Sequence, residues 1–232
     1  MMVFRDFSAS SIFLAATGLF ISTGASAAPF TLDFEGVADT TQILDFYNGG
    51  TDAAGNSGIN YGVSFGPNAL GLIDRDAGGN GNFANEPTPD TSMFFLTGSA
   101  ILNYAPGFDT GFSFFYTSAF DATVTVWDSL DATGALLGTL DLFTNSVANN
   151  CSGDPQGGPG DPLGQFCNWD IASLGFSDIA KSIDFSGTVN QVGFDNITFG
   201  SVNPAVVPVP AAVWLFGSGL LGLAGISRRK HV

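Results

Sequence analysis

The chain has 232 residues and a net charge of −15, with 21 acidic residues against six lysines and arginines. A surface this acidic repels nucleic acid and anionic lipid, so both are excluded as partners, whereas divalent cations are attracted. A solvated acidic surface without a specific metal is the alternative to a cation site.

The first 27 residues have the pattern of a secretory signal peptide. Arg5 precedes the apolar stretch Ile12–Ile21, and Ala25-Ser26-Ala27 supplies a small-residue cleavage site. We expect cleavage after Ala27 rather than after Ala28. The protein is therefore predicted to be exported.

The segment 28–203 is long enough for one well-buried domain, and strand signals dominate it. Residues 122–128 alternate Thr123, Thr125 and Trp127 with two valines, which is typical of a half-buried strand. A turn at 131–134 and a strand at 135–143 follow, so a hairpin is expected. Further strands are predicted at 30–34, 63–65, 93–96, 111–116, 182–185 and 191–199, and no stretch of ten residues has a convincing helical period. The fold predicted is all-β: a single antiparallel β-sandwich.

The loop that begins at Asp74 is a candidate calcium loop. Asp74, Asp76, Asn80 and Asn82 occupy positions 1, 3, 7 and 9 of an EF-hand-like pattern, with Gly at position 6. Position 12 is Asn85, so the bidentate Glu of that motif is missing. We favour a flexible polar loop over a calcium site here.

Cys151 and Cys167 are the only cysteines, and a Gly-, Pro- and Asp-rich loop separates them. In an exported protein this arrangement predicts one disulfide. The sole histidine, His231, lies near the C-terminal end, so Ser-His-Asp and Cys-His catalysis are excluded for segment 28–203. Glycoside hydrolysis needs only two carboxyl groups and survives this filter, with Asp33/Glu35 and Asp74/Asp76 as formal pairs. The domain is nevertheless predicted not to be an enzyme.

The segment 204–232 predicts a membrane-spanning end. The uncharged run 211–226 contains Trp214 and is followed by Arg228, Arg229 and Lys230, which favour the cytoplasmic side. A buried core helix is the alternative.

This end resembles the PEP-CTERM sorting signal of Gram-negative bacteria. The resemblance rests on Val207, Pro208, Val209 and Pro210, on the apolar run to Gly222, and on the basic residues at 228–230. It implies recognition by an exosortase, a transient anchor in the inner membrane, and then the cell surface or an exopolysaccharide matrix. Val209 stands where the family has Glu.

The two ends of the segment 28–203 resemble, more weakly, the terminal strands of jelly-roll carbohydrate-binding-like modules. The matching residues are Thr31–Gly36 and Gly193–Phe199. In such folds these strands lie side by side, and an acidic residue from each contributes to a structural Ca²⁺ site. Carried over, the resemblance implies Glu35 and Asp195 as ligands.

The leading functional hypothesis is a surface-sorted, non-enzymatic protein of the exopolysaccharide or biofilm matrix. The alternative is a carbohydrate-binding module that recognises the exopolysaccharide, and a glycosidase is a weaker third. Candidate platforms for sugar stacking are Trp127, Trp169, Tyr104 and Tyr116, although we expect Trp127 to pack in the core.

Overall fold

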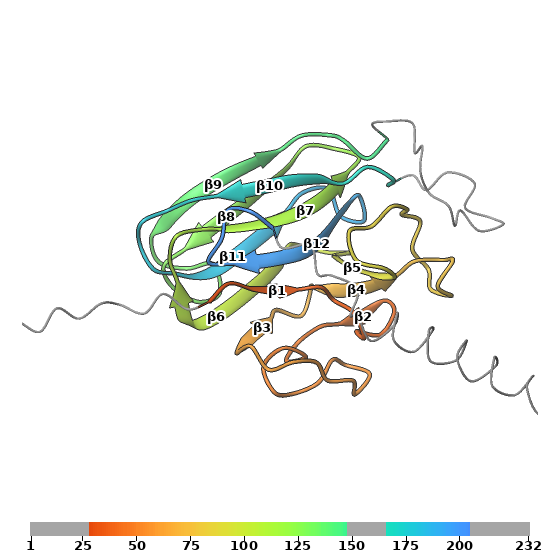
Figure 1. The fold of residues 1–232 in the computed structure, drawn as a ribbon, viewed down its shortest axis with the longest axis horizontal. Coiled ribbons are helices and arrows are strands. Elements are labelled where there is room, and N and C mark those ends of the chain that lie inside the picture. Colours follow the sequence, from red (N-terminus) through yellow and green to blue (C-terminus); the bar gives the residue numbers. More distant parts are fainter. Residues whose placement is uncertain (1–27, 148–165, 205–232) are drawn as a thin grey trace, which may run out of the picture.

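The computed structural model of the chain describes residues 28–147 and 166–204, and within these ranges it contains β-strands and no helix. The strands are β1 (Phe30–Leu32), β2 (Thr41–Gln42), β3 (Val63–Phe65), β4 (Leu70–Ile73), β5 (Thr91–Phe94), β6 (Ala100–Phe108), β7 (Phe112–Ser118), β8 (Ala122–Trp127), β9 (Leu136–Leu142), β10 (Asp170–Leu174), β11 (Ala180–Ser186) and β12 (Val192–Phe199). Figure 1 shows them in chain order.

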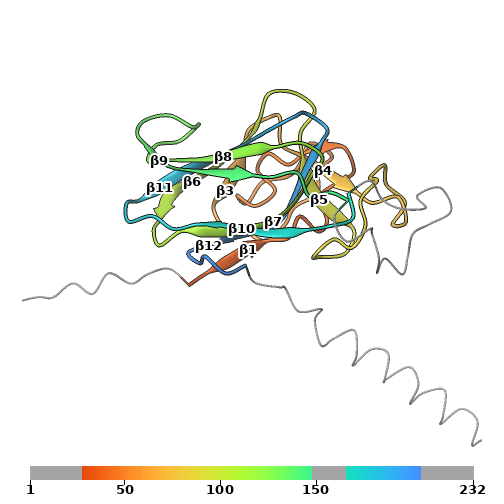
Figure 2. The ribbon, with the colours of Figure 1, turned by 90° about the horizontal axis from the view of Figure 1, so that it is seen from above.

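The strands form two antiparallel sheets that face each other as two layers (Figure 2). One sheet has the order β10-β7-β12-β5-β4-β2, with β1 also paired to β12, and the other has the order β3-β6-β11-β8-β9. From β5 to β8, and again from β9 to β12, successive strands alternate between the sheets. This alternation is jelly-roll-like, and the predicted antiparallel sandwich is confirmed.

The first and last strands lie side by side, as the sequence predicts. Phe30 is opposite Phe199, and Leu32 is opposite Ile197. This pairing brings the segment after β1, which carries Glu35, close to β12, which carries Asp195.

Aromatic side chains fill the space between the layers. Phe114 and Phe194 of the larger sheet meet Phe185 of the smaller sheet, with ring centroids 4.8–5.8 Å apart. All three are fully buried, so they tie the two sheets together.

Four strands were not anticipated from the sequence: β2, β4, β6 and β10. The nine-residue strand β6 contains Pro106-Gly107, a dipeptide that normally marks a turn. In the structure these residues lie where the β6–β11 register shifts, and Gly107 has φ +80°. A bulge accommodates Pro because the missing N–H is not required there.

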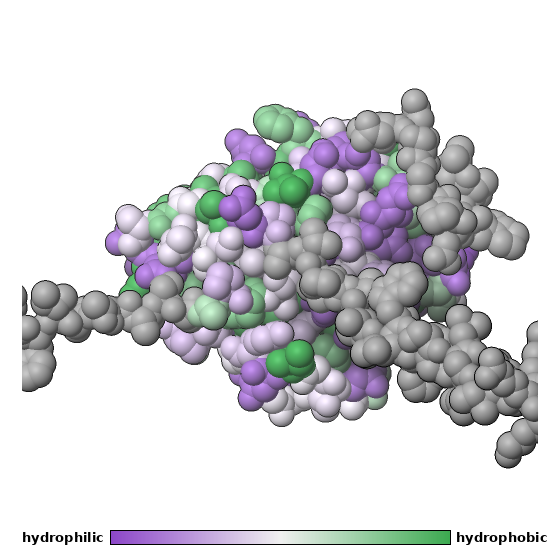
Figure 3. Space-filling model, in the orientation of Figure 1, coloured by the Kyte–Doolittle hydropathy of each residue, from purple (hydrophilic) through white to green (hydrophobic). Residues whose placement is uncertain are grey.

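Within the described ranges no helix is long and apolar enough to span a membrane. The predicted signal peptide and the predicted sorting helix both lie outside those ranges, as do all sorting-motif residues from Val207 to Lys230. On the face drawn in Figure 3, apolar residues form separate small patches between hydrophilic ones.

Candidate functional site

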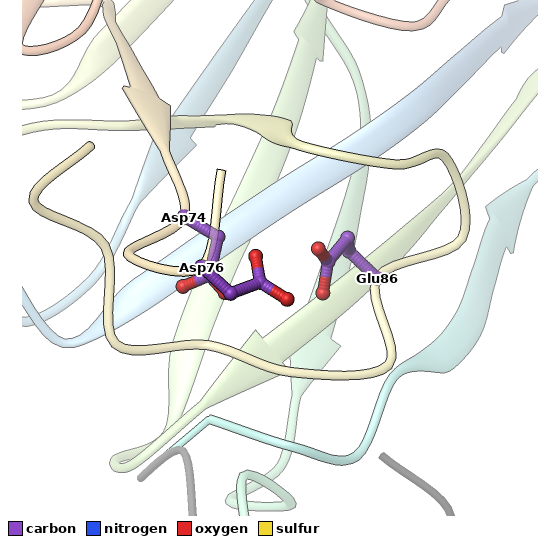
Figure 4. Close-up of side chains that lie close together, drawn as sticks. All are labelled: Asp74, Asp76 and Glu86. Atoms are coloured by element: carbon purple, nitrogen blue, oxygen red, sulfur yellow. The ribbon is translucent and has the colours of Figure 1, made fainter. Parts of the chain in front are cut away.

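Three carboxylates converge beside the loop that follows β4. Each of Asp74, Asp76 and Glu86 offers an oxygen within 4.8 Å of the others, and Figure 4 shows the side chains of Asp76 and Glu86 facing each other. Burial, together with the charges of Asp74 and Asp76, raises the pKa of Glu86 to about 7. Hard oxygen ligands at this spacing can hold a divalent cation.

This cluster differs from the EF-hand pattern. The third carboxylate belongs to Glu86, one residue beyond position 12 of the EF-hand pattern. The match to that pattern did not identify it. Asn80 turns away, since its amide donates to Asp39 Oδ2. Asn82 lines a hollow on the larger sheet instead.

Glu35 and Asp195 hold opposite ends of one short segment, 88–91. Asp195 Oδ2 accepts hydrogen bonds from Thr88 N at 3.0 Å and from Thr88 Oγ1 at 2.8 Å. Glu35 Oε1 accepts from Thr91 N at 3.0 Å. The two residues that the resemblance pairs are thus brought to the same place by the β1–β12 pairing.

Burial and nearby negative charges disfavour the ionised forms of Glu35 and Asp195. Burial raises the pKa of Glu35 to about 8, and neighbouring Asp90, Asp33 and Glu86 add to the effect. Burial, with the charge of Glu35, raises the pKa of Asp195 well above its usual range. The atoms nearby that could coordinate a metal ion are all oxygens: the carboxylates of Glu35 and Asp195, the hydroxyl of Thr88 and the amide oxygen of Asn196. Such an all-oxygen set fits Ca²⁺. Glu35 and Asp195 would be its charged ligands.

The structure describes only one of the two cysteines of the predicted disulfide. Cys167 is buried and has no free thiol. Cys151 lies outside the described ranges, so the Cys151–Cys167 bond stays a prediction.

Trp127 is not a core residue, and that expectation was wrong. On β8 the buried residues are Ala122, Val124 and Val126, whereas Trp127 belongs to the half-buried set. Its ring Nε1 donates to Thr125 Oγ1 at 3.0 Å, so the indole lies along its own strand.

We call the outward surface of the smaller sheet around this ring the Trp127 face. Across β11 it includes Asp184, which is opposite Thr125, and across β9 it includes Asp141, which is opposite Thr123. Asp184 Oδ1 is buried and has no hydrogen-bond partner among the residues that the structure describes. The Trp127 face thus combines an indole with carboxylates and hydroxyls, and Trp127, Thr123, Thr125, Asp141 and Asp184 define it.

The other aromatic candidates are engaged elsewhere. Tyr116 is buried, and its hydroxyl donates to Phe143 O at 3.3 Å. Trp169 stands at 90° to Phe83, and its Nε1 donates to Ala84 O at 3.1 Å. Tyr104 packs against Phe30 and lines an apolar hollow of about 170 Å³ at the edge of the β1–β12 pair.

Two carboxyl groups at a spacing that suits glycoside hydrolysis occur among the described residues, but outside the two hollows. Two carboxyl groups about 5 Å apart suit a retaining mechanism, and Asp76 and Glu86 come this close. A sugar ring must also fit between them, and neither the 170 Å³ hollow nor the one lined by Asn82 includes these residues or Glu35.

Comparisons with known proteins show a broad likeness only. No family model and no curated protein matches the chain. Among solved structures, the K2 cleaved adhesin domain of Lys-gingipain matches 75% of this chain and 100% of its own length, at 11% identity and a TM-score of 0.47. A family 6 carbohydrate-binding module matches 59% of this chain and 86% of its own, at 18% identity and a TM-score of 0.35. A Bacillus subtilis family 43 arabinoxylan arabinofuranohydrolase matches 60% of this chain but only 26% of its own, at 18% identity and a TM-score of 0.35. At these values the similarities carry no argument about function.

Proposed function

We propose that the β-sandwich is a non-catalytic carbohydrate-binding domain and that the Trp127 face is its sugar-contacting surface. The observation that carries this proposal is the position of Trp127, which stands on an outward sheet surface with its ring fixed by Thr125. An indole face suits the apolar C–H face of a pyranose, and fixing the ring beforehand lowers the entropy lost on binding.

The neighbours of the indole suit sugar hydroxyls. The exposed Asp141 offers carboxylate oxygens as acceptors, and Thr123 and Thr125 offer hydroxyls. A few polar groups around an aromatic surface are the usual composition of a small-molecule site.

Charge narrows the class of glycan. Segment 28–203 carries 20 acidic residues and only Arg75 and Lys181 as basic ones. Uronate-rich or sulfated polysaccharides would be repelled by such a surface. We therefore expect the ligand to be a neutral polysaccharide.

Tryptophan fluorescence tests this proposal. Titration with neutral polysaccharides should change the emission of the wild type with a saturable curve. Titration calorimetry, which needs no tryptophan reporter, should show that Trp127→Ala binds at least about tenfold more weakly, the loss of about 1.4 kcal/mol. Ile59→Ala removes an exposed apolar side chain of the β2–β3 connection, outside the Trp127 face, and should bind as the wild type does. Equal binding by Trp127→Ala and the wild type would place the sugar elsewhere.

We further propose that this domain is exported and sorted to the cell surface or the exopolysaccharide matrix by an exosortase that reads Val207–Pro210. The support is the sequence pattern of the two ends. Replacing Arg228, Arg229 and Lys230 with neutral residues should change membrane retention or processing in cell fractionation. Unchanged fractionation would contradict the sorting role.

A further inference from the structure

A second surface of the sandwich carries a small hollow, which we call the roofed hollow. It lies on the outward side of the larger sheet, where Thr117 of β7 is opposite Gly193 of β12, and Ser92 of β5 also lines it. Water-sized groups fit within it over about 30 Å³.

The roof is built from two segments that run side by side. Phe83 and Phe166 form a parallel bridge, and Ala84 N donates to Phe166 O at 3.0 Å. Trp169 Nε1 donates to Ala84 O, and Asn85 Nδ2 donates to Cys167 O at 3.0 Å. Several hydrogen bonds therefore hold the hollow open between the sheet and an aromatic cover.

Two residues of the lining carry buried hydroxyls. Ser92 and Thr117 are each 1% exposed, and neither Ser92 Oγ nor Thr117 Oγ1 has a hydrogen-bond partner among the described residues. Buried hydroxyls left unpaired reduce the stability of a fold, so a polar group is expected to reach them.

The lining defines the chemistry of that group. It contains the amides of Asn82 and Asn190 and the rings of Phe83, Phe94 and Phe166, but no charged residue. Hydroxyls and amides both donate and accept, which suits a neutral hydroxyl-bearing ligand. The volume admits a branch of one or two heavy atoms rather than a whole sugar ring.

We infer that the roofed hollow binds the hydroxymethyl group of a hexose unit. This inference rests on the proposed glycan binding but concerns a different surface. Strand β8, which carries Trp127, and strands β7 and β12, which line the roofed hollow, belong to opposite layers of the sandwich (Figure 2). One domain would then bind two segments of polysaccharide and link them. Binding at two sites at once raises the avidity although the affinity of each single site is unchanged.

Matched sugars test the inference directly. Glucose and galactose are compared with their 6-deoxy analogues at millimolar concentration by protein-observed NMR. The parent sugars should shift the amide signals of Ser92, Thr117 and Gly193, and the 6-deoxy sugars should bind at least about tenfold more weakly, because the hydroxyls then stay unpaired. Equal binding by both sugars, or no shift at these residues, would overturn the inference.

Variants separate a binding role from a structural one. Thr117→Val and Ser92→Ala should lose the hexose response while their melting temperatures stay level or rise, because an apolar side chain removes an unpaired hydroxyl. Gly193→Ala would place a methyl group 3.4 Å from Thr117 Cγ2 and from Trp169, on the floor of the hollow, and should also lose the response. A lower melting temperature in Thr117→Val with hexose binding intact would mean that bound water only satisfies the hydroxyl, and would contradict the inference.

The two proposals fail separately. If Trp127→Ala weakens polysaccharide binding but hexoses do not shift the amide signals of the roofed hollow, only the inference about the hollow is contradicted. If the hollow responds to hexoses and Trp127→Ala binds polysaccharide normally, only the assignment of the Trp127 face falls.

Discussion

Asp195 is fully buried, and a buried carboxylate needs donors or a cation to compensate its charge. Thr88 and the backbone N–H of Asn196 supply three hydrogen bonds, yet Glu35 adds a second negative charge nearby. Two carboxylates in one partly buried place favour either a bound proton or a bound cation. The state of this site should therefore depend on both pH and calcium.

The pH dependence without calcium has a definite sign. The pKa of Glu35 is raised from 4.5 to about 8, so the folded protein keeps a proton that the unfolded chain releases above pH 4.5. Stability conferred by this group is present below pH 4.5 and is lost as pH rises towards 8. Thermal melts in chelator should thus show a falling melting temperature between pH 5 and 8.

Calcium should reverse that loss. At pH 8 a calcium concentration 100-fold above the dissociation constant adds about 2.7 kcal/mol, or roughly 5–10 °C in the melting temperature. Glu35→Gln removes one charge and should melt higher than the wild type in chelator at pH 8, but lose the calcium response. The control is Asp76→Asn, which changes the separate Asp74 cluster and should keep the calcium response that depends on Glu35. An equal calcium shift in Glu35→Gln and the wild type would contradict the assignment of Glu35.

The outward orientation of Trp127 could have been predicted from the sequence. The alternation already grouped Trp127 with Thr123 and Thr125, opposite to Val124 and Val126. Parity along the strand therefore indicated the outward face, and the general tendency of Trp to be buried pointed the wrong way. Glu86 could not be found in this way, since only loop closure, with Asp74 N donating to Asp90 O at 2.8 Å, brings it to Asp74.

At the scale of elements, the connection between β2 and β3 is long and has no strand of its own. Asp52 organises it: the carboxylate is 2% exposed and accepts from Ala38 N, Ala54 N and Asn56 N at 2.8–2.9 Å, and from Asn56 Nδ2 at 3.0 Å. Although burial opposes the shift, these donors together lower the pKa of Asp52. One side chain thus fixes a loop that no strand pairing fixes.

Removing this carboxylate should loosen the connection. Asp52→Ala leaves three backbone donors unpaired, and we expect a loss of about 3 kcal/mol, or roughly 6–12 °C in the melting temperature. The matched control is Asp45→Ala, since Asp45 is exposed in the same connection. Because the pKa of Asp52 is lowered, its contribution is present above the pKa of the unfolded chain and disappears in acid. Equal melting of the two variants at pH 7 would contradict this role.

Strand prediction succeeded where alternation was clear and failed where other signals interfered. Strand β3 was predicted with its observed bounds, and β8 and β9 to within one residue at each end. Strand β6 was missed because Pro106-Gly107 indicates a turn, and only its pairing with β11 through a bulge makes it a strand. Strand β10 lies at a sheet edge and is exposed on most residues, so its pattern lacks an apolar face.

At the scale of the molecule, the fold separates two surfaces that each suit a sugar. One sheet presents the Trp127 face, the other carries the roofed hollow, and the buried phenylalanines between them hold the layers together. The acidic residues around segment 88–91 join the two ends of the domain through Glu35 and Asp195. We propose that a cation at Glu35 and Asp195 stabilises the scaffold while the outward faces bind the glycan.

The most direct test of the central claim is affinity electrophoresis in gels that contain neutral polysaccharides, with Trp127→Ala beside the wild type. We expect the wild type to be retarded by at least one neutral polysaccharide, Trp127→Ala to be retarded much less than the wild type, and uronate-rich gels to retard neither. A wild type that no polysaccharide retards, or a Trp127→Ala variant retarded as strongly as the wild type, would contradict the claim that the Trp127 face binds carbohydrate.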